Sequence, residues 1–154
     1  MSADLKTTIS GYLSKMGFSP TYDEQKNQFR TVIKLKNDVS GAEFDFPIAV
    51  TLLKDWVVTE CAIVDLNHVP SSISLEKMYD GMLRANFTFP EINYALYNST
   101  VVSLAWNLIP ALSYENFHSE FLGVLSGVEK FSKVVSYAQQ VSSPPPKEFA
   151  PIYQ

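Results

Sequence analysis

The feature that most constrains the fold of this chain is a long amphipathic pattern near its C-terminus. Ser113 predicts a helix N-cap, Glu115 stands where the helix dipole favours a carboxylate, and the helix is expected to run from Tyr114 to Gln140. At a rise of about 1.5 Å per residue it would span about 40 Å, the full width of one domain. Its apolar stripe consists of Phe117, Phe121, Val124, Val128, Phe131, Val135 and Ala138. Such a helix must lie across a sheet.

The rest of the chain is expected to form one domain with this helix. A length of 154 residues is enough for one ordinary domain and too short for two comfortable ones. Ser142 to Pro146 open a polar, proline-rich segment that cannot continue a helix. We therefore predict a single α+β domain over residues 1–141 and a flexible tail over residues 142–154.

Three segments in the first half of the chain predict an antiparallel meander. Residues 29–36 and 44–52 alternate apolar and polar side chains, the period of a half-buried strand, and Pro47 suggests a bulge or an edge position. Residues 56–66 form an almost uninterrupted apolar run, in which Cys61 is expected to be a small core residue. That run predicts a central strand, covered on both faces, or by helices on one face and by a partner on the other.

Helices and a hairpin complete the predicted order. Apolar spacing predicts a helix over residues 2–16 and a second from residue 75 to about residue 86. Residues 92–97 and 101–108 flank a two-residue turn and predict a β-hairpin. On the last helix, Gly123 and Gly127 suggest close approach of another helix, with chance as the alternative.

Composition and motifs argue against most chemistry. With 12 basic and 16 acidic residues the chain has a net charge of −4 and no basic block, so we expect no nucleic-acid binding. His68 and His118 have no partner at ligand spacing, and Glu43 and Asp45 are expected on a solvated strand face. Glycine-rich phosphate loops and the nucleophile elbow are absent from the sequence. We therefore expect no enzyme, no metal and no cofactor.

The compartment is predicted from hydropathy. The chain opens without a basic and then apolar leader pattern, and no apolar run approaches the roughly 20 residues that span a bilayer. The sequence predicts a cytoplasmic protein without membrane association.

Three stretches carry a resemblance to a known fold. They are Met82-Leu83-Arg84-Ala85-Asn86, the strand pair of residues 94–96 and 101–104, and the capped helix start Ser113-Tyr114-Glu115-Asn116-Phe117. The chain resembles the type III secretion chaperone-like fold, shared by secretion chaperones and the YbjN-like group, over roughly residues 3–138. The resemblance implies a helix, an antiparallel meander, a helix, a hairpin and a long helix packed on one sheet. It also implies a non-catalytic domain that commonly dimerises and offers apolar grooves to a polypeptide.

The second helix carries the candidate site. Flexible thioethers beside aromatic rings are typical of adaptable binding surfaces. If the first and last helices cover one sheet face, this helix is left to pack at an edge or across a two-fold axis. The alternative is that its stripe simply packs on the sheet. The predicted partner-binding or dimer residues are Met78, Tyr79, Met82, Leu83, Phe87 and Phe89.

The predicted function is a protein-binding or regulatory module, chaperone-like, acting as a homodimer with an unidentified polypeptide as a further partner. The alternative is a small-molecule or lipid-binding domain with an apolar cavity under the long C-terminal helix. A filled core and a dimer interface above about 1,000 Å² would favour the first function. An enclosed pocket of about 300 Å³ or more would favour the second.

Overall fold

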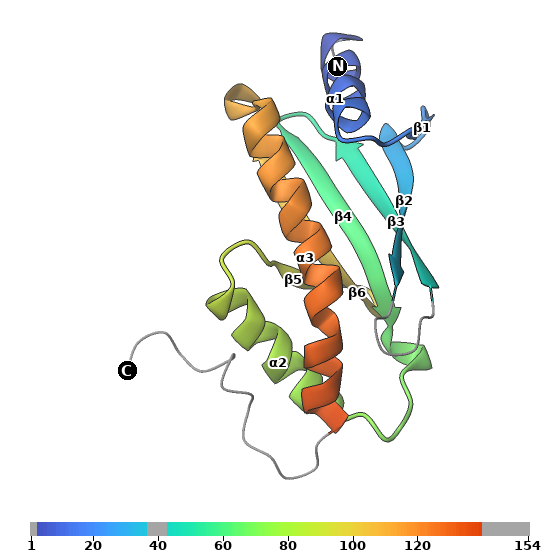
Figure 1. Cartoon of the computed structure of the whole chain (residues 1–154), viewed down its shortest axis with the longest axis vertical. Helices are drawn as coiled ribbons and strands as arrows, with labels where there is room; N and C mark the ends of the chain where they lie inside the picture. The colour runs from blue at the N-terminus through green and yellow to red at the C-terminus, as the bar shows by residue number, and fades with distance from the viewer. Residues whose placement is uncertain (1–2, 37–42, 140–154) are drawn as a thin grey trace.

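The computed structural model describes residues 3–36 and 43–139, and these residues form an α+β fold (Figure 1). The helices are α1 (Ala3–Lys15), α2 (Leu75–Thr88) and α3 (Tyr114–Gln139), with short 3-10 turns η1 (Leu66–His68) and η2 (Ile109–Ala111). The strands are β1 (Thr21–Asp23), β2 (Gln28–Lys36), β3 (Glu43–Leu52), β4 (Trp56–Asp65), β5 (Tyr94–Tyr97) and β6 (Thr100–Leu108). The predicted order is therefore confirmed. The predicted tail lies outside the described residues.

The six strands form one antiparallel sheet in the order β1-β2-β3-β4-β6-β5. The hairpin of β5 and β6 places its second strand against β4, so β4 is central, as its apolar sequence predicts. Asn27 and Asn98 lie in the turns before β2 and β6 with φ of 52° and 53°. Asparagine tolerates this left-handed conformation better than most residues, which favours tight turns at both positions.

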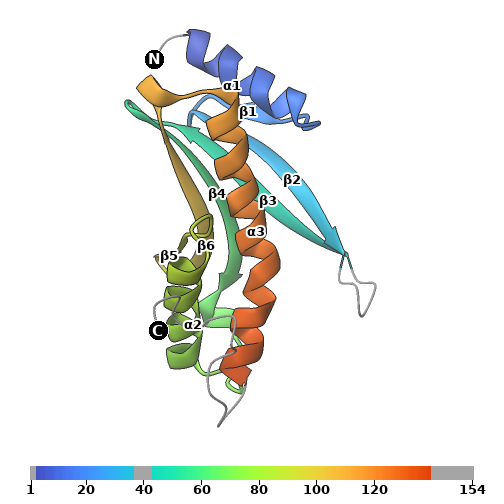
Figure 2. The same cartoon turned by 60° about the vertical axis from the view of Figure 1, so that its left-hand side comes forward.

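Pro47 marks the point where the sheet divides. β3 pairs with β2 along its whole length, but with β4 only from Ile48 to Leu52. Before Ile48, the side of β3 that faces away from β2 is therefore not paired with β4. Pro47 thus lies at an edge position, as the sequence suggests. In β4 a bulge between Ala62 and Val64 lies near the same place. The β2–β3 hairpin consequently diverges from β4 toward its tip (Figure 2).

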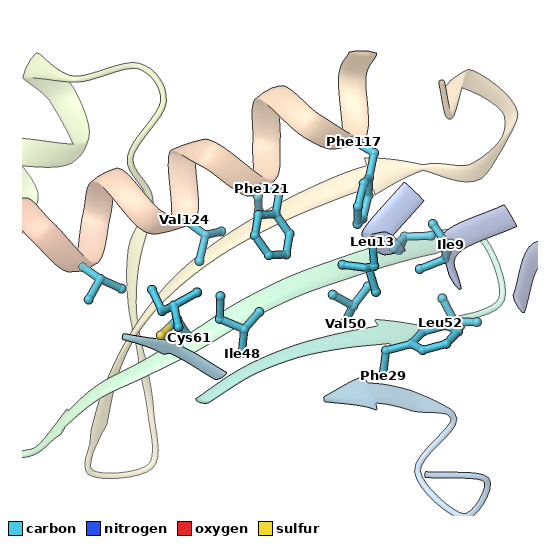
Figure 3. Close-up of a cluster of buried hydrophobic side chains, with 14 residues drawn as sticks. Ile9, Leu13, Phe29, Ile48, Val50, Leu52, Cys61, Phe117, Phe121 and Val124 are labelled. Carbon is cyan, nitrogen blue, oxygen red and sulfur yellow. The ribbon is translucent and has the colours of Figure 1, made fainter. Parts of the chain in front are cut away.

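The three helices lie on one face of this sheet, which we call the inner face (Figure 2). Phe117 and Phe121 from α3, and Ile9 and Leu13 from α1, are fully buried over strands β2, β3, β4 and β6 (Figure 3). Cys61 of β4 lies in the same cluster, so the prediction of a core cysteine is confirmed. The Ser113 cap is confirmed as well, since its Oγ accepts a hydrogen bond of 3.1 Å from the Asn116 N–H.

A second cluster fills the space between α2, the C-terminal half of α3 and the β5–β6 end of the sheet. Tyr94 of β5 donates its hydroxyl to the Gly127 carbonyl at 2.5 Å, and burial raises the pKa of that phenol. The cluster consists of Met78, Met82, Ala85, Ile92, Tyr94, Val101, Phe131, Val134, Tyr137 and Ala138. One continuous helix, α3, therefore closes both clusters.

The glycines of α3 leave room for the segment before β5 and for strand β6, and not for another helix. A Cβ on Gly123 would overlap the Glu91 carbonyl, and a Cβ on Gly127 would overlap the Ser103 side chain on β6. The close approach suggested by the sequence is confirmed, but the suggestion that a helix makes it is wrong. A backbone carbonyl before β5 and a small strand residue reach the helix because glycine leaves room for them.

Candidate functional site

The outward side of α2 carries a row of exposed apolar side chains. Leu75, Tyr79, Leu83 and Phe87 follow one another at intervals of four residues, with 39%, 38%, 70% and 56% of their surface exposed. This spacing keeps them on one slowly turning side of the helix. We call these four residues the α2 stripe. A single exposed leucine is ordinary, whereas an exposed row on one helix is typical of an interface.

The inward side of the same helix belongs to the core. Met78 and Met82 are 1% and 6% exposed, and they lie in the cluster that α3 closes with Phe131 and Val134. Phe89 is half-buried against this cluster, with the Lys130 Nζ 4.6 Å from its ring centre. The structure thus divides the six predicted site residues into an exposed and a packed group. For Met78 and Met82 it shows the packing that the alternative expected, although the packing partner is mainly α3.

A polar contact fixes α2 on α3. The Asp80 Oδ2 accepts hydrogen bonds of 2.8 Å from the Arg84 Nε and 2.8 Å from the Tyr137 hydroxyl. The hydrogen bond from Arg84 is the main reason why the pKa of Asp80 lies below its usual value. The contact with Asp80 in turn raises the pKa of Tyr137. Because α3 holds α2 in this orientation, the α2 stripe is presented away from the core.

An apolar groove of about 900 Å³ lies between the diverging β2–β3 hairpin and the C-terminal half of α3. It is open to solvent rather than enclosed. Its lining is mainly apolar, with Lys34, Lys36 and Glu129 among the polar residues. The apolar lining residues are Leu35, Phe44, Phe46, Ile63, Val64, Val128, Phe131 and Val135.

The face of the sheet opposite the helices, the outer face, is also rich in apolar side chains. The Trp56 and Trp106 rings meet edge to face with centroids 6.1 Å apart, and 39% and 51% of these two residues is exposed. Val58 is the register partner of Trp106 and is 7% exposed. Next to Val58 on the same strand, the half-buried Glu60 borders a hollow of about 390 Å³. No helix among the described residues covers this face (Figures 1 and 2).

Sequence reasoning left open a partner on one face of residues 56–66 but named no residue of that face, because the run is apolar at nearly every position and hides its alternation. A signal was nevertheless present. The exposed Trp56 precedes the fully buried Val57 on β4, and the exposed Trp106 lies between the buried Ala105 and Asn107 on β6. Tryptophan at exposed strand positions is a compositional mark of interfaces.

The residues with reactive side chains are dispersed over the structure. His68 pairs with the exposed Asp65 at 3.2 Å, and His118 stacks on Tyr114. Burial, and then the charge of Glu60, raise the pKa of the Cys61 thiol to about 12. Within residues 3–36 and 43–139 no group of three His, Cys, Asp or Glu residues could hold a metal ion. None of the described helices is long and apolar enough to cross a membrane.

Known protein families and curated protein sequences give no match to this chain. Solved structures do match, at low sequence identity. A chain of the ExsC–ExsE complex has a TM-score of 0.56 at 14% identity, covering 88% of this chain and 96% of that one. A chain of the HopA1–SchA chaperone–effector complex has a TM-score of 0.56 at 11% identity, covering 82% and 91%. A chain of the heterodimeric ExoU–SpcU complex from the type III secretion system of Pseudomonas aeruginosa has a TM-score of 0.52 at 13% identity, covering 82% and 97%.

These similarities show the fold. The type III secretion chaperone-like architecture expected from the sequence is confirmed over most of the chain. The likeness to the YbjN-like group stays a prediction. A shared fold does not by itself transfer a function, which must be argued from the surfaces described above.

Proposed function

We propose that this protein is a cytoplasmic, non-catalytic, chaperone-like module that binds a polypeptide and acts as a homodimer through α2. The observation that carries the dimer is the α2 stripe, whose central residue Leu83 is 70% exposed on a helix fixed by its other side. The observation that supports polypeptide binding is the fold itself. It is shared with structures of chaperone and effector proteins in complex.

The stripe suits a two-fold axis. Its residues extend about 18 Å along the helix, enough for two copies of α2 to cross and pack their stripes together. A two-fold contact is self-complementary, so one apolar row can serve both protomers. Full burial of Leu83 and Phe87 would contribute about 1.5–3 kcal/mol for each side chain. The stripe alone is smaller than a stable interface of about 1,000 Å², so neighbouring residues must take part.

The dimer is best tested in the α2 stripe, and not at Met82, although Met82 is one of the six predicted site residues. A charged residue at Met82 would enter the core, where it would unfold the protein without reporting on association. The groove under α3 does not favour the alternative of small-molecule or lipid binding, because it is open and not an enclosed cavity. We infer that polypeptide binding explains the exposed apolar surfaces better.

The dimer is tested with Leu83→Asp, using light scattering coupled to size exclusion and circular dichroism to verify folding. We expect a dimer for the unmodified protein and a folded monomer for the variant. Leu122→Asp is the matched control, since Leu122 is an exposed leucine on α3 outside the stripe. A dimer that persists in Leu83→Asp, or that is lost equally in Leu122→Asp, would contradict the assignment.

Polypeptide binding is tested separately with a permanently unfolded probe, reduced and carboxymethylated α-lactalbumin carrying a fluorescent label. Saturable anisotropy changes with the unfolded probe, but not with the labelled native protein, are expected. Absence of binding to the unfolded probe would contradict the proposed function, whatever the oligomeric state.

A further inference from the structure

Strands β4 and β6 place apolar rows on the outer face of the sheet, and one of these rows includes the carboxylate of Glu60. Neighbouring strands place Trp56 opposite Leu108, Val58 opposite Trp106, and Glu60 opposite Leu104. Because antiparallel partners share a face, these pairs form three successive rows on the outer face. Successive rows are two positions apart along β4, a distance of about 7 Å.

Glu60 is the charged residue within these three rows, and Lys26 and Arg30 border the same hollow. Arg30 pairs with Asp23 at 3.5 Å, and Lys34 pairs with Asp45 at 3.8 Å. Among the described residues no ion pair includes Glu60, and its pKa is raised because burial removes water from the carboxylate. A carboxylate in such surroundings is stabilised when a cation approaches it.

We propose that the outer face of the sheet binds an amphipathic helix of a partner polypeptide, with a basic residue at Glu60 and apolar residues over Trp106 and Trp56. The proposal rests on the proposed function, because it identifies the chemical class of the polypeptide and the surface that receives it. Charge complementarity with Glu60 selects a cation, and the indole pair selects apolar side chains next to it.

A helix fits this face better than an extended segment. A strand lying flat on a sheet face would leave its backbone groups without partners, whereas a helix satisfies its own. The rows of Val58–Trp106 and Trp56–Leu108 lie about 7 and 14 Å from that of Glu60. Residues four and eight positions along a helix lie about 6 and 12 Å away, within reach of flexible side chains. The inner face, covered by α3, shows that a helix packs on this sheet.

Intrinsic fluorescence provides a selective readout, because the chain contains two tryptophans and both lie on the outer face. The probe is a synthetic helical peptide of about 18 residues with one lysine and with leucines four and eight positions further on. A second peptide carries glutamate in place of the lysine. Each is titrated into the full-length protein while tryptophan emission and peptide anisotropy are recorded.

The lysine peptide is expected to bind saturably and to shift the tryptophan emission. Glu60→Gln should weaken this binding by about tenfold, between the effects of exposed and of buried charge pairs. Glu60→Lys should abolish binding of the lysine peptide. The Glu60→Lys protein should instead bind the glutamate peptide. Removing the charge of Glu60 does not endanger folding, because no described residue pairs with it. Glu129→Gln is the matched control, since Glu129 is an exposed carboxylate beside the groove under α3.

Equal affinity of the lysine peptide for the unmodified protein and Glu60→Gln would overturn the proposal. So would a loss in Glu129→Gln, or anisotropy changes without any change in tryptophan emission, because both would place the peptide elsewhere. If the unfolded α-lactalbumin probe still binds in these cases, the proposed function stands and only this surface is wrong. If the unmodified protein binds neither probe, both fail.

Discussion

The two faces of the sheet are built from alternating residues of the same strands, yet they meet different surroundings. On β4, Val57, Thr59 and Cys61 point inward and are fully buried under α1 and α3. Trp56, on the outer face of the same strand, is 39% exposed. The inner face is apolar because the monomer needs a core. The outer face is mainly apolar on β4 and β6, although no described element covers it.

This difference separates residues that fold the protein from residues available for binding. An inner-face side chain is held by the helices, so its loss should cost stability. An outer-face side chain makes few contacts within the isolated protein. Its removal should therefore weaken association more than it lowers the free energy of unfolding. Four predictions test this separation.

The largest contrast is expected in thiol reactivity between adjacent positions on opposite faces. Cys61 is buried on the inner face with a pKa near 12, so about one thiol in ten thousand is ionised at pH 8. In Cys61→Ala/Ala62→Cys the single thiol lies on the exposed outer face with a pKa near the ordinary value of about 8.5. Alkylation by iodoacetamide at pH 8 should be at least about a thousandfold faster in that variant.

The rate of alkylation of Cys61 should rise with pH. A raised pKa keeps Cys61 protonated and unreactive until the pH approaches 12, unless the protein unfolds. Urea should therefore increase its alkylation sharply at constant pH. Similar rates for the two thiols without denaturant would show that the inner face is open at β4.

A second contrast compares aromatic residues on the two faces. Phe121→Ala leaves a cavity beneath α3 and should lower the free energy of unfolding by about 3–5 kcal/mol. Trp106→Ala should cost about 1 kcal/mol or less, because half of its surface is already exposed. Urea denaturation followed by circular dichroism measures both. An equal cost for the two variants would mean that the outer face is covered in the isolated protein.

The same contrast explains which parts of the fold were predictable from sequence. The cap at Ser113 and the stripe through Phe117 and Phe121 depend on neighbours within a few residues, so the sequence predicts α3 well. The placement of β6 between β4 and β5 depends on distant pairing, and no local pattern specifies it. In residues 56–66 nearly every side chain is apolar, so the strand was predictable and its covered face was not.

The candidate site was predictable only in part for a related reason. α2 is apolar on two sides, one with Met78 and Met82 and the other with Leu83 and Phe87. Periodicity predicts the helix but cannot say which side meets α3. Glu60 was not distinguished for a different reason. No ion pair among the described residues includes Glu60, and nearby pairs such as Arg30–Asp23 are brought together only by the fold.

A third prediction tests how closely α3, which covers the inner face, approaches the segment before β5. Gly123→Ala places a methyl group against the Glu91 backbone carbonyl, which cannot move as a flexible side chain can. We expect a loss of about 1–3 kcal/mol in the free energy of unfolding. Gly11→Ala on α1 is the matched control, because a Cβ there meets nothing within 4 Å. It should stabilise the protein by about 0.4–1 kcal/mol. A stabilised Gly123→Ala would show that α3 lies further from the segment before β5.

The smallest expected effect reverses sign between the faces. Thr59, on the inner face of β4, is 0% exposed, and its hydroxyl has no hydrogen-bond partner among the described residues. Thr59→Val keeps the shape of the side chain and removes an unsatisfied polar group, so it should stabilise the protein by about 1 kcal/mol. Thr51, on the outer face of β3, accepts a hydrogen bond of 2.8 Å from Gln28. Thr51→Val should therefore destabilise it by about 0.5 kcal/mol. Thermal and urea unfolding of the two variants would decide, and destabilisation by Thr59→Val would mean that water reaches the inner face.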